Sequence, residues 1–149
     1  MLSLPVQRAT DLDLDRIDVV FSAVESDVAR EIEPRYAATT PVISNASAFR
    51  YTDDVPILIP GVNWEHAPLL EVQRQRRGWR GFITPMANCT TIGLVIALKP
   101  LYDAFGISRC VMTSMQGVSG AGRSPGVVAL DIVDNIIPYI HGEEEKVAK

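Results

Sequence analysis

The segment RIDVVFSAV, residues 16–24, is a short run of β-branched apolar residues that ends in small side chains. Such a run predicts a buried parallel strand with a loop at its carboxyl end. Ser26 and Asp27 follow as candidate helix caps, and residues 28–37, VAREIEPRYA, have the composition of the helix that they would begin. The segment therefore predicts the strand–helix unit from which parallel α/β sheets are built.

The same alternation continues along the chain. TPVISNAS, residues 40–47, predicts a second strand, and VPILIPGVN, residues 55–63, predicts a third that its prolines confine to an extended segment or a sheet edge. Residues 66–79 predict an amphipathic helix closed by Gly78, and residues 81–88 predict another short strand. Strands that alternate with helices predict an α/β fold with parallel pairing.

The second half of the chain repeats these signals less regularly. The apolar residues from Thr90 to Phe105 predict a mostly buried helix that Gly106 can cap. Residues 108–116 predict one more strand, residues 117–126 form a glycine-rich loop, and residues 127–140 predict a helix or an extended run before an acidic tail. We expect a partial Rossmann-like sheet that leads into a second domain.

The composition excludes several classes of function. The net charge is −4 and the pI about 5.1, so we expect no nucleic-acid partner. The two cysteines and two histidines show no metal-ligand spacing, so we expect no metal. Neither a basic leader nor a long apolar stretch occurs, so we expect a cytoplasmic protein without membrane contact. One local cluster of positive residues reads as a solvated helix face: Arg74, Arg76, Arg77 and Arg80.

Cys89 stands where polar coil gives way to the apolar helix. Asn88 can cap that helix, and a helix N-terminus carries about half a positive charge, worth roughly 0.3–1 kcal/mol to an anion. This is too little to make a thiol reactive without a neighbouring base or cation. From the residues alone, Cys89 is either a nucleophile or an inert residue at the start of a helix. Cys110, inside a β-rich run, is expected in the core.

The loop QGVSGAGRSPG, residues 116–126, carries the second chemical signal. Its glycines let backbone N–H groups approach a phosphate or a cofactor ring closely. The order of the glycines is not that of the dinucleotide-binding fingerprint, however, so the loop could also be a plain turn.

Taken together, these segments resemble aspartate-semialdehyde dehydrogenase, especially its archaeal and fungal form. The resemblance rests on ANCTTIGLVIALKPLYDAFGI, MQGVSGAG, LDIVDNIIPYIHGEEEK, VVFSAVESDVA and ISNASAFRYTDDVPILIPGVN, and it runs in family order from Asp18 to Lys146. It implies that residues 1–87 are the C-terminal portion of a dinucleotide-binding domain. Residues 88–149 would then be the N-terminal portion of an α+β catalytic and dimerisation domain.

The resemblance also implies roles for individual residues. Cys89 corresponds to the nucleophile that forms the acyl-enzyme, and Gln116 to the glutamine that orients the acyl group. The residues implied for substrate and phosphate binding are Arg50, Asn88, Glu144 and Lys146. Those implied for contact with NADP are Ser22, Ala23, Ser119, Gly120, Ala121 and Gly122.

The chemistry implied by the family is the reduction of β-aspartyl phosphate to aspartate semialdehyde, with release of phosphate, in the biosynthesis of lysine, methionine and threonine. A thiolate suits it because a thioester accepts hydride more easily than an oxygen ester does. First-turn N–H groups of the helix could stabilise the oxyanion. The family further implies a homodimer or homotetramer.

Other interpretations stay open at this point. The family's first glycine-rich turn, its catalytic histidine and its carboxylate-binding arginine have no counterpart here, so we expect an interior piece that is inactive by itself. A malonyl-CoA reductase-like paralogue and a truncated assembly module without activity are alternatives. A cysteine hydrolase would need Cys89 to contact His66 or His141.

Overall fold

The computed structural model of the 149-residue chain describes residues 5–117 and 134–148. By their contacts the residues divide into two compact parts, Met1–Ile96 and Ala97–Lys149, which are described separately below. The boundary expected between residues 87 and 88 stays a prediction.

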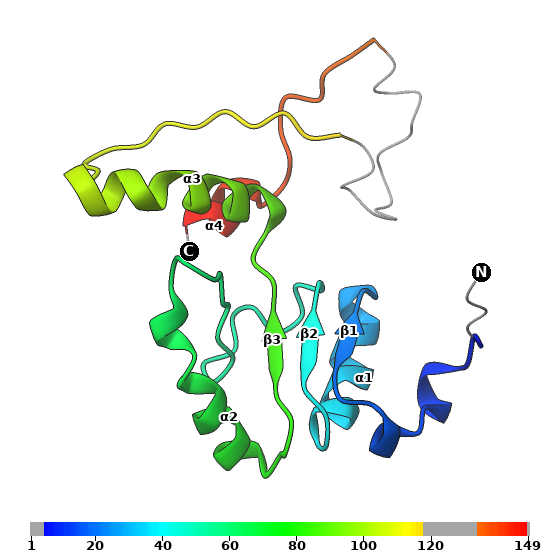
Figure 1. The fold of residues 1–149 in the computed structure, drawn as a ribbon. Coiled ribbons are helices and arrows are strands. Elements are labelled where there is room, and N and C mark those ends of the chain that lie inside the picture. Colours follow the sequence, from blue (N-terminus) through cyan, green and yellow to red (C-terminus); the bar gives the residue numbers. More distant parts are fainter. Residues whose placement is uncertain (1–4, 118–133, 149) are drawn as a thin grey trace. The chain divides into compact units, whose positions relative to one another are not determined.

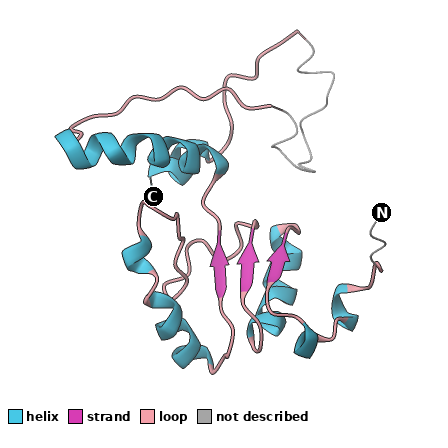
Figure 2. Ribbon diagram, viewed as in Figure 1, coloured by secondary structure: helices cyan, strands magenta, loops and turns pink. Residues whose placement is uncertain are grey.

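Three parallel strands lie at the centre of the first part (Figures 1 and 2). They are β1 (Val20–Ser22), β2 (Val42–Ser44) and β3 (Ile83–Pro85), in the spatial order β1-β2-β3. Val20 pairs with Val42, and Val42 with Ile83, so the three strands run in register and end together. Strands and helices alternate as expected, and the α/β class with parallel pairing is confirmed.

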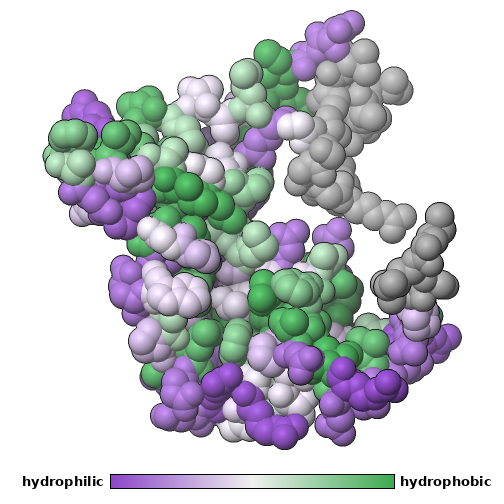
Figure 3. All heavy atoms as spheres, viewed as in Figure 1, coloured by the Kyte–Doolittle hydropathy of each residue, from purple (hydrophilic) through white to green (hydrophobic). Residues whose placement is uncertain are grey.

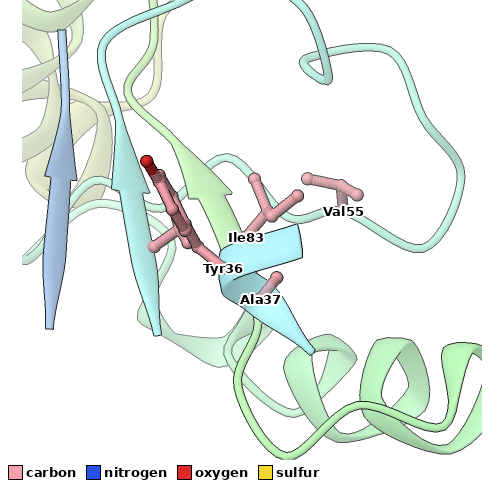
Figure 4. Packing of buried hydrophobic residues seen from close by; sticks show 5 residues of the cluster. Tyr36, Ala37, Val55 and Ile83 are labelled. Carbon is pink, nitrogen blue, oxygen red and sulfur yellow. The ribbon is translucent and has the colours of Figure 1, made fainter. Parts of the chain in front are cut away.

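Helix α1 (Ser26–Ala37) packs on one face of this sheet and contacts all three strands. The residues of that face are buried, except Val20, which is partly buried, whereas Phe21, which alternates to the opposite face, is largely exposed. Figure 4 shows the core that results, in which Tyr36 and Ala37 of α1 meet Val55 and Ile83. Buried apolar area of this kind stabilises the fold by about 25 cal/mol per Å².

Helix α2 (Leu69–Arg77) ends at Gly78, as expected. Gly78 has a φ of 66°, a left-handed conformation that costs glycine little because it lacks a Cβ. Short 3-10 turns complete the first part: Ala9–Asp11, Leu14–Arg16 and Trp64–His66.

The prediction of a strand at residues 55–63 is wrong. The backbone N–H and carbonyl groups of Ile83, which such a strand would bind, are already hydrogen-bonded to Gln73. Gln73, fully buried on α2, donates from Nε2 to the carbonyl oxygens of Ile83 and Asp54, and its Oε1 accepts the Ile83 N–H. The side-chain amide thus takes the place of a neighbouring strand at the outer edge of β3. Residues 55–59 belong to no helix or strand, although the Thr84 hydroxyl donates to the Pro56 carbonyl oxygen.

The arginine cluster is also not a purely solvated face. Arg77 donates from two nitrogens to the two carboxylate oxygens of Asp54, at 2.6 and 2.7 Å, and lies over the Trp79 ring. Arg74 lies over the ring of Phe82. Only two members of the cluster, Arg76 and Arg80, are exposed as expected.

Helix α3 (Cys89–Phe105) begins and ends where the sequence predicts, with Gly106 after it at a φ of 69°. The expectation that it is mostly buried is wrong: none of its residues is buried, and Phe105 is 83% exposed. Apolar residues recur all round this helix, so one neighbouring element can cover only part of it. Figure 3 shows apolar side chains at the surface of the molecule.

The second part contains α4 (Glu143–Ala148). The strand expected at residues 108–116 is not formed, and Cys110, expected in the core, is exposed. A strand needs a neighbouring strand for its backbone groups, and none of the described strands pairs with this segment. Asp134 lies in a turn with a φ of 54°, and residues 135–140 belong to no helix or strand. The rest of the segment expected as a helix or an extended run, residues 127–133, lies outside the described residues.

Candidate active site

The carboxyl ends of the three strands meet at one edge of the sheet (Figure 1). Three loops leave from this edge: residues 23–25 after β1, residues 45–50 after β2 and residues 86–88 after β3. In parallel α/β sheets this edge is where ligands bind, because helix N-termini and loop residues converge on it. Five of the residues implicated by the sequence lie in or beside these loops: Ser22, Ala23, Arg50, Asn88 and Cys89.

Cys89 is the first residue of α3, and it is exposed. Asn88 caps the helix: its side-chain oxygen accepts the N–H groups of Thr90 and Thr91, at 2.9 and 3.3 Å. The Ile92 N–H donates to the Asn88 carbonyl oxygen. The N–H groups of Thr90, Thr91 and Ile92 are therefore already hydrogen-bonded. Of the first-turn N–H groups expected to stabilise an oxyanion, this leaves the Cys89 N–H, which has no acceptor among the described residues.

Arg50 links two of the loops. Its Nε–H donates to the carbonyl oxygen of Met86 at 2.8 Å, and its Nη2 donates to the carbonyl oxygen of Asn45 at 3.3 Å. Met86 lies three residues before Cys89 in the loop that leads into α3. The structure thus places the guanidinium of Arg50 against the loop that leads to Cys89.

Ser22 and Ala23 lie at the end of β1. Ser22 is buried, its carbonyl oxygen accepts the Asn45 N–H, and its hydroxyl oxygen has no partner among the described residues. Ala23 is exposed. A buried hydroxyl without a partner at a ligand-binding edge suits a polar group of a bound molecule, such as a cofactor amide. The other four residues implicated in cofactor binding, Ser119, Gly120, Ala121 and Gly122, lie outside the described residues.

The second part of the chain brings two further predicted residues together. Gln116 donates from Nε2 to Glu143 Oε1 at 2.7 Å, and Lys146 Nζ lies 3.4 Å from Glu143 Oε2. Glu143 is buried, whereas Glu144, the glutamate implicated by the sequence, is exposed. The glutamate that contacts both Gln116 and Lys146 is therefore Glu143. The spacing of Glu143 and Lys146, three residues apart on a helix, was the signal that could have found it.

The requirement for a cysteine hydrolase is not met at His66. The His66 ring Nδ1 lies 3.4 Å from Asn63 Nδ2, and Cys89 Sγ lies 4.0 Å from Thr90 Oγ1. Within residues 5–117 and 134–148, no three histidine, cysteine or acidic side chains form a group that could hold a metal. Among the described helices, none combines the length and the apolar character needed to cross a bilayer.

Comparison with known proteins identifies two domains. Residues 2–69 match the model described as semialdehyde dehydrogenase, NAD binding domain, and residues 98–149 match the one described as semialdehyde dehydrogenase, dimerisation domain. An aspartate-semialdehyde dehydrogenase from Archaeoglobus fulgidus is 57% identical over 131 residues, which are 87% of this chain and 38% of that protein. A malonyl CoA reductase (NADP) from Metallosphaera sedula is 41% identical over 137 residues, 91% of this chain and 38% of that protein.

A solved structure agrees with these matches. The crystal structure of aspartate-semialdehyde dehydrogenase with NADP from Candida albicans superposes with a TM-score of 0.64 and 38% identity, over 87% of this chain and 37% of that one. The chain thus spans less than two-fifths of the length of these relatives. Since the two family models together account for most of its residues, the chain belongs to the semialdehyde dehydrogenase family.

Proposed function

We propose that the chain carries the acyl-accepting cysteine and part of the NADP site of a phosphorylating aspartate-semialdehyde dehydrogenase. The reaction would reduce β-aspartyl phosphate to aspartate semialdehyde, in the biosynthesis of lysine, methionine and threonine. The observation that carries the proposal is the exposed Cys89 at the start of α3, with the Arg50 guanidinium bound to the loop before it.

The first chemical step falls to Cys89. Its thiolate sulfur forms a bond to the acyl carbon, the bond from that carbon to the phosphate oxygen breaks, and inorganic phosphate leaves. The Cys89 N–H, at the positive end of α3, supports the oxyanion that forms on the carbonyl. Asn88 contributes by capping the helix and so fixing the position of the thiol.

Arg50 would hold the phosphate of the substrate. A guanidinium presents planar N–H donors that match phosphate oxygens, and its charge offsets that of the leaving group. Lys146 is the second cation proposed for this role. The Met86 carbonyl fixes Arg50 in one orientation, so less side-chain entropy is lost when phosphate binds.

Gln116, Glu143 and Lys146 would act as one unit. The Glu143 carboxylate accepts from Gln116 and pairs with Lys146, so it orients an amide and an ammonium group at once. We propose that Glu143 takes the role that the family resemblance gave to Glu144, near the amino group of the substrate. Gln116 would then orient the acyl group.

NADP would bind at the carboxyl end of β1, where Ser22 and Ala23 lie, together with Ser119, Gly120, Ala121 and Gly122. Bound there, the reduced cofactor would supply the hydride that reduces the thioester to the aldehyde and frees the Cys89 thiolate. The buried Ser22 hydroxyl can donate to or accept from a cofactor amide. The match to an NAD-binding domain model supports this assignment.

The match to a dimerisation domain model, together with the exposed apolar side chains of α3, supports a homodimer or homotetramer. Because the proposed reaction draws on dissolved metabolites, we propose a cytoplasmic location.

Malonyl-CoA reductase is the second candidate, because one relative carries that name. Both reactions need a thiolate that accepts an acyl group, but they differ in the leaving group, which is phosphate in one and coenzyme A in the other. The Arg50 cation beside the Cys89 loop favours the acyl phosphate.

The test is the oxidation of NADPH by the complete product of the gene, with β-aspartyl phosphate or with malonyl-CoA as the acyl donor. We expect turnover with β-aspartyl phosphate and a much lower kcat/KM with malonyl-CoA. The reverse preference would assign the malonyl-CoA reductase reaction. Absence of both activities in a folded protein that binds NADPH would favour an assembly module.

A further inference from the structure

A carboxyl group is buried beneath the sheet, where an apolar side chain would be the usual choice. Glu33 of α1 is 0% exposed, while Glu31, two residues earlier on the same helix, lies in an exposed ion pair with Arg35. Burial of a carboxyl group is costly unless hydrogen bonds compensate for the lost water. The burial of Glu33 therefore requires an explanation in terms of its contacts.

The partner of Glu33 is Ser44, the last residue of β2. The Ser44 hydroxyl donates to Glu33 Oε1 at 2.5 Å, and both side chains are almost completely buried. A hydroxyl has one proton, so this bond decides where its lone pairs point. One of them accepts the Ala46 N–H at 3.1 Å, which forms the turn that leaves the strand.

This turn is the base of the loop that carries Arg50. The Asn45 N–H donates to the Ser22 carbonyl oxygen at 2.8 Å, and Arg50 Nη2 donates to the Asn45 carbonyl oxygen. The Ser47 hydroxyl lies 2.8 Å from that of Ser26, at the start of α1. The course of the loop from Ser44 therefore determines where Arg50 meets the Met86 carbonyl oxygen.

We propose that Glu33 is a positioning residue for Arg50. By holding the Ser44 hydroxyl in one orientation, it fixes the turn at Ala46 and keeps the guanidinium against the loop that precedes Cys89. The part of this inference that concerns phosphate rests on the function proposed above. The part that concerns the position of Arg50 does not.

Three substitutions separate this role from a general contribution to packing. Glu33→Gln keeps the shape and leaves an amide oxygen that can accept the Ser44 hydroxyl, whereas Glu33→Ala removes the acceptor. Ser44→Ala removes the hydroxyl through which Glu33 would act. Glu31→Ala is the matched control, since it removes an exposed carboxylate from the same helix.

The first measurement is nuclear magnetic resonance of the 149-residue chain without any ligand. In Glu33→Ala and in Ser44→Ala we expect the Ala46 amide to exchange about tenfold faster, which corresponds to the loss of roughly one hydrogen bond. The Arg50 Nε–H resonance should shift in the same variants. Glu33→Gln and Glu31→Ala should leave both signals close to those of the unaltered chain.

The double variant Glu33→Ala with Ser44→Ala tests whether the two residues act in series. We expect it to match Ser44→Ala alone, since the path from Glu33 would already be broken. Additive effects on the Ala46 exchange rate would overturn the proposal. So would an unshifted Arg50 Nε–H signal in a folded Glu33→Ala or Ser44→Ala chain.

The second measurement is a titration with inorganic phosphate, followed at the Arg50 Nε–H signal. We expect weaker binding, by about tenfold, in Glu33→Ala and in Ser44→Ala but not in Glu33→Gln. If the unaltered chain itself binds no phosphate at Arg50, the assignment of Arg50 as the phosphate-binding residue is wrong. The ligand-free signals still decide whether Glu33 positions Arg50.

Discussion

The Arg50 guanidinium and the Met86 carbonyl oxygen are joined by a 2.8 Å hydrogen bond across 36 positions of sequence. This bond connects the loop after β2 to the loop that ends at Cys89. A cation that is distant in the sequence is thereby held against the loop that leads to Cys89. The position of Arg50 in the candidate site therefore depends on this hydrogen bond.

Arg50 can be tested by two substitutions in the complete gene product. In Arg50→Ala we expect kcat/KM for β-aspartyl phosphate to fall about 10- to 100-fold, because a hydrogen bond to a charged group is worth roughly 1.5–3 kcal/mol. Arg50→Lys keeps the charge but loses the planar fork, so its loss should be intermediate. Arg76→Ala, which removes an exposed arginine from α2, should change kcat/KM little, and an equal loss there would argue against a local role for Arg50.

Glu143 and Glu144 form a matched pair for substitution. Glu143→Ala removes the acceptor of Gln116 and the partner of Lys146, so we expect kcat/KM to fall by at least about tenfold. Glu144 is exposed, and Glu144→Ala should stay within about twofold of the unaltered enzyme, as surface substitutions usually do. The opposite order of the two losses would restore the role that the family resemblance gave to Glu144.

The pairing of Asp54 with Arg77 makes stability depend on pH. The hydrogen bond from Arg77 lowers the pKa of Asp54 below its usual value, against the opposing effect of burial. A lowered pKa in the folded state means that the ion pair stabilises the fold above about pH 4, and that this stabilisation is lost as the pH falls through the lowered pKa.

Urea unfolding at several pH values checks this expectation. Asp54→Asn should lower the free energy of unfolding near pH 7 by about 1.5–3 kcal/mol, and the difference from the unaltered chain should shrink below about pH 4. Glu71→Ala is the control, because the pair of Glu71 with Arg74 is more exposed and should be worth less than about 1 kcal/mol. A difference for Asp54→Asn that does not change with pH would contradict the assignment.

We expect the buried polar amide of Gln73 to raise the free energy of unfolding, because it hydrogen-bonds to buried backbone groups. In Gln73→Leu the buried Ile83 N–H and the carbonyl oxygens of Ile83 and Asp54 lose their partner, so the free energy of unfolding should fall by at least about 2 kcal/mol. Gln75→Ala, on the exposed side of α2, should change it by less than about 0.5 kcal/mol. Equal effects of the two substitutions would mean that the contacts of Gln73 carry no special weight.

The sequence predicts those elements whose signals are local. The β-branched runs at Val20 and Val42, and the glycine after Arg77, each depend on a few neighbouring residues, and the structure confirms them. The third expected strand, at residues 55–63, is wrong because the edge of β3 is occupied by Gln73, a residue whose long-range contact leaves no trace in the periodicity.

The candidate site shows the same limit. The sequence places Cys89 at a helix start, which the structure confirms, since a cap and an apolar run are local signals. It does not show that Arg50 reaches Met86, or that Glu143 rather than Glu144 contacts Gln116, because both depend on the course of loops in space. The buried Glu33 likewise looks like any glutamate of an amphipathic helix until its contact with Ser44 is seen.

Whether Cys89 accepts the acyl group can be measured by the mass of the intact protein after brief exposure to β-aspartyl phosphate without NADPH. Cys89 and Cys110 are both exposed, so Cys110→Ser serves as the matched control for reactivity that depends only on access. We expect one aspartyl group per chain in the unaltered protein and in Cys110→Ser, with release of one phosphate, and none in Cys89→Ser. Equal labelling of the unaltered protein and Cys89→Ser would contradict the account.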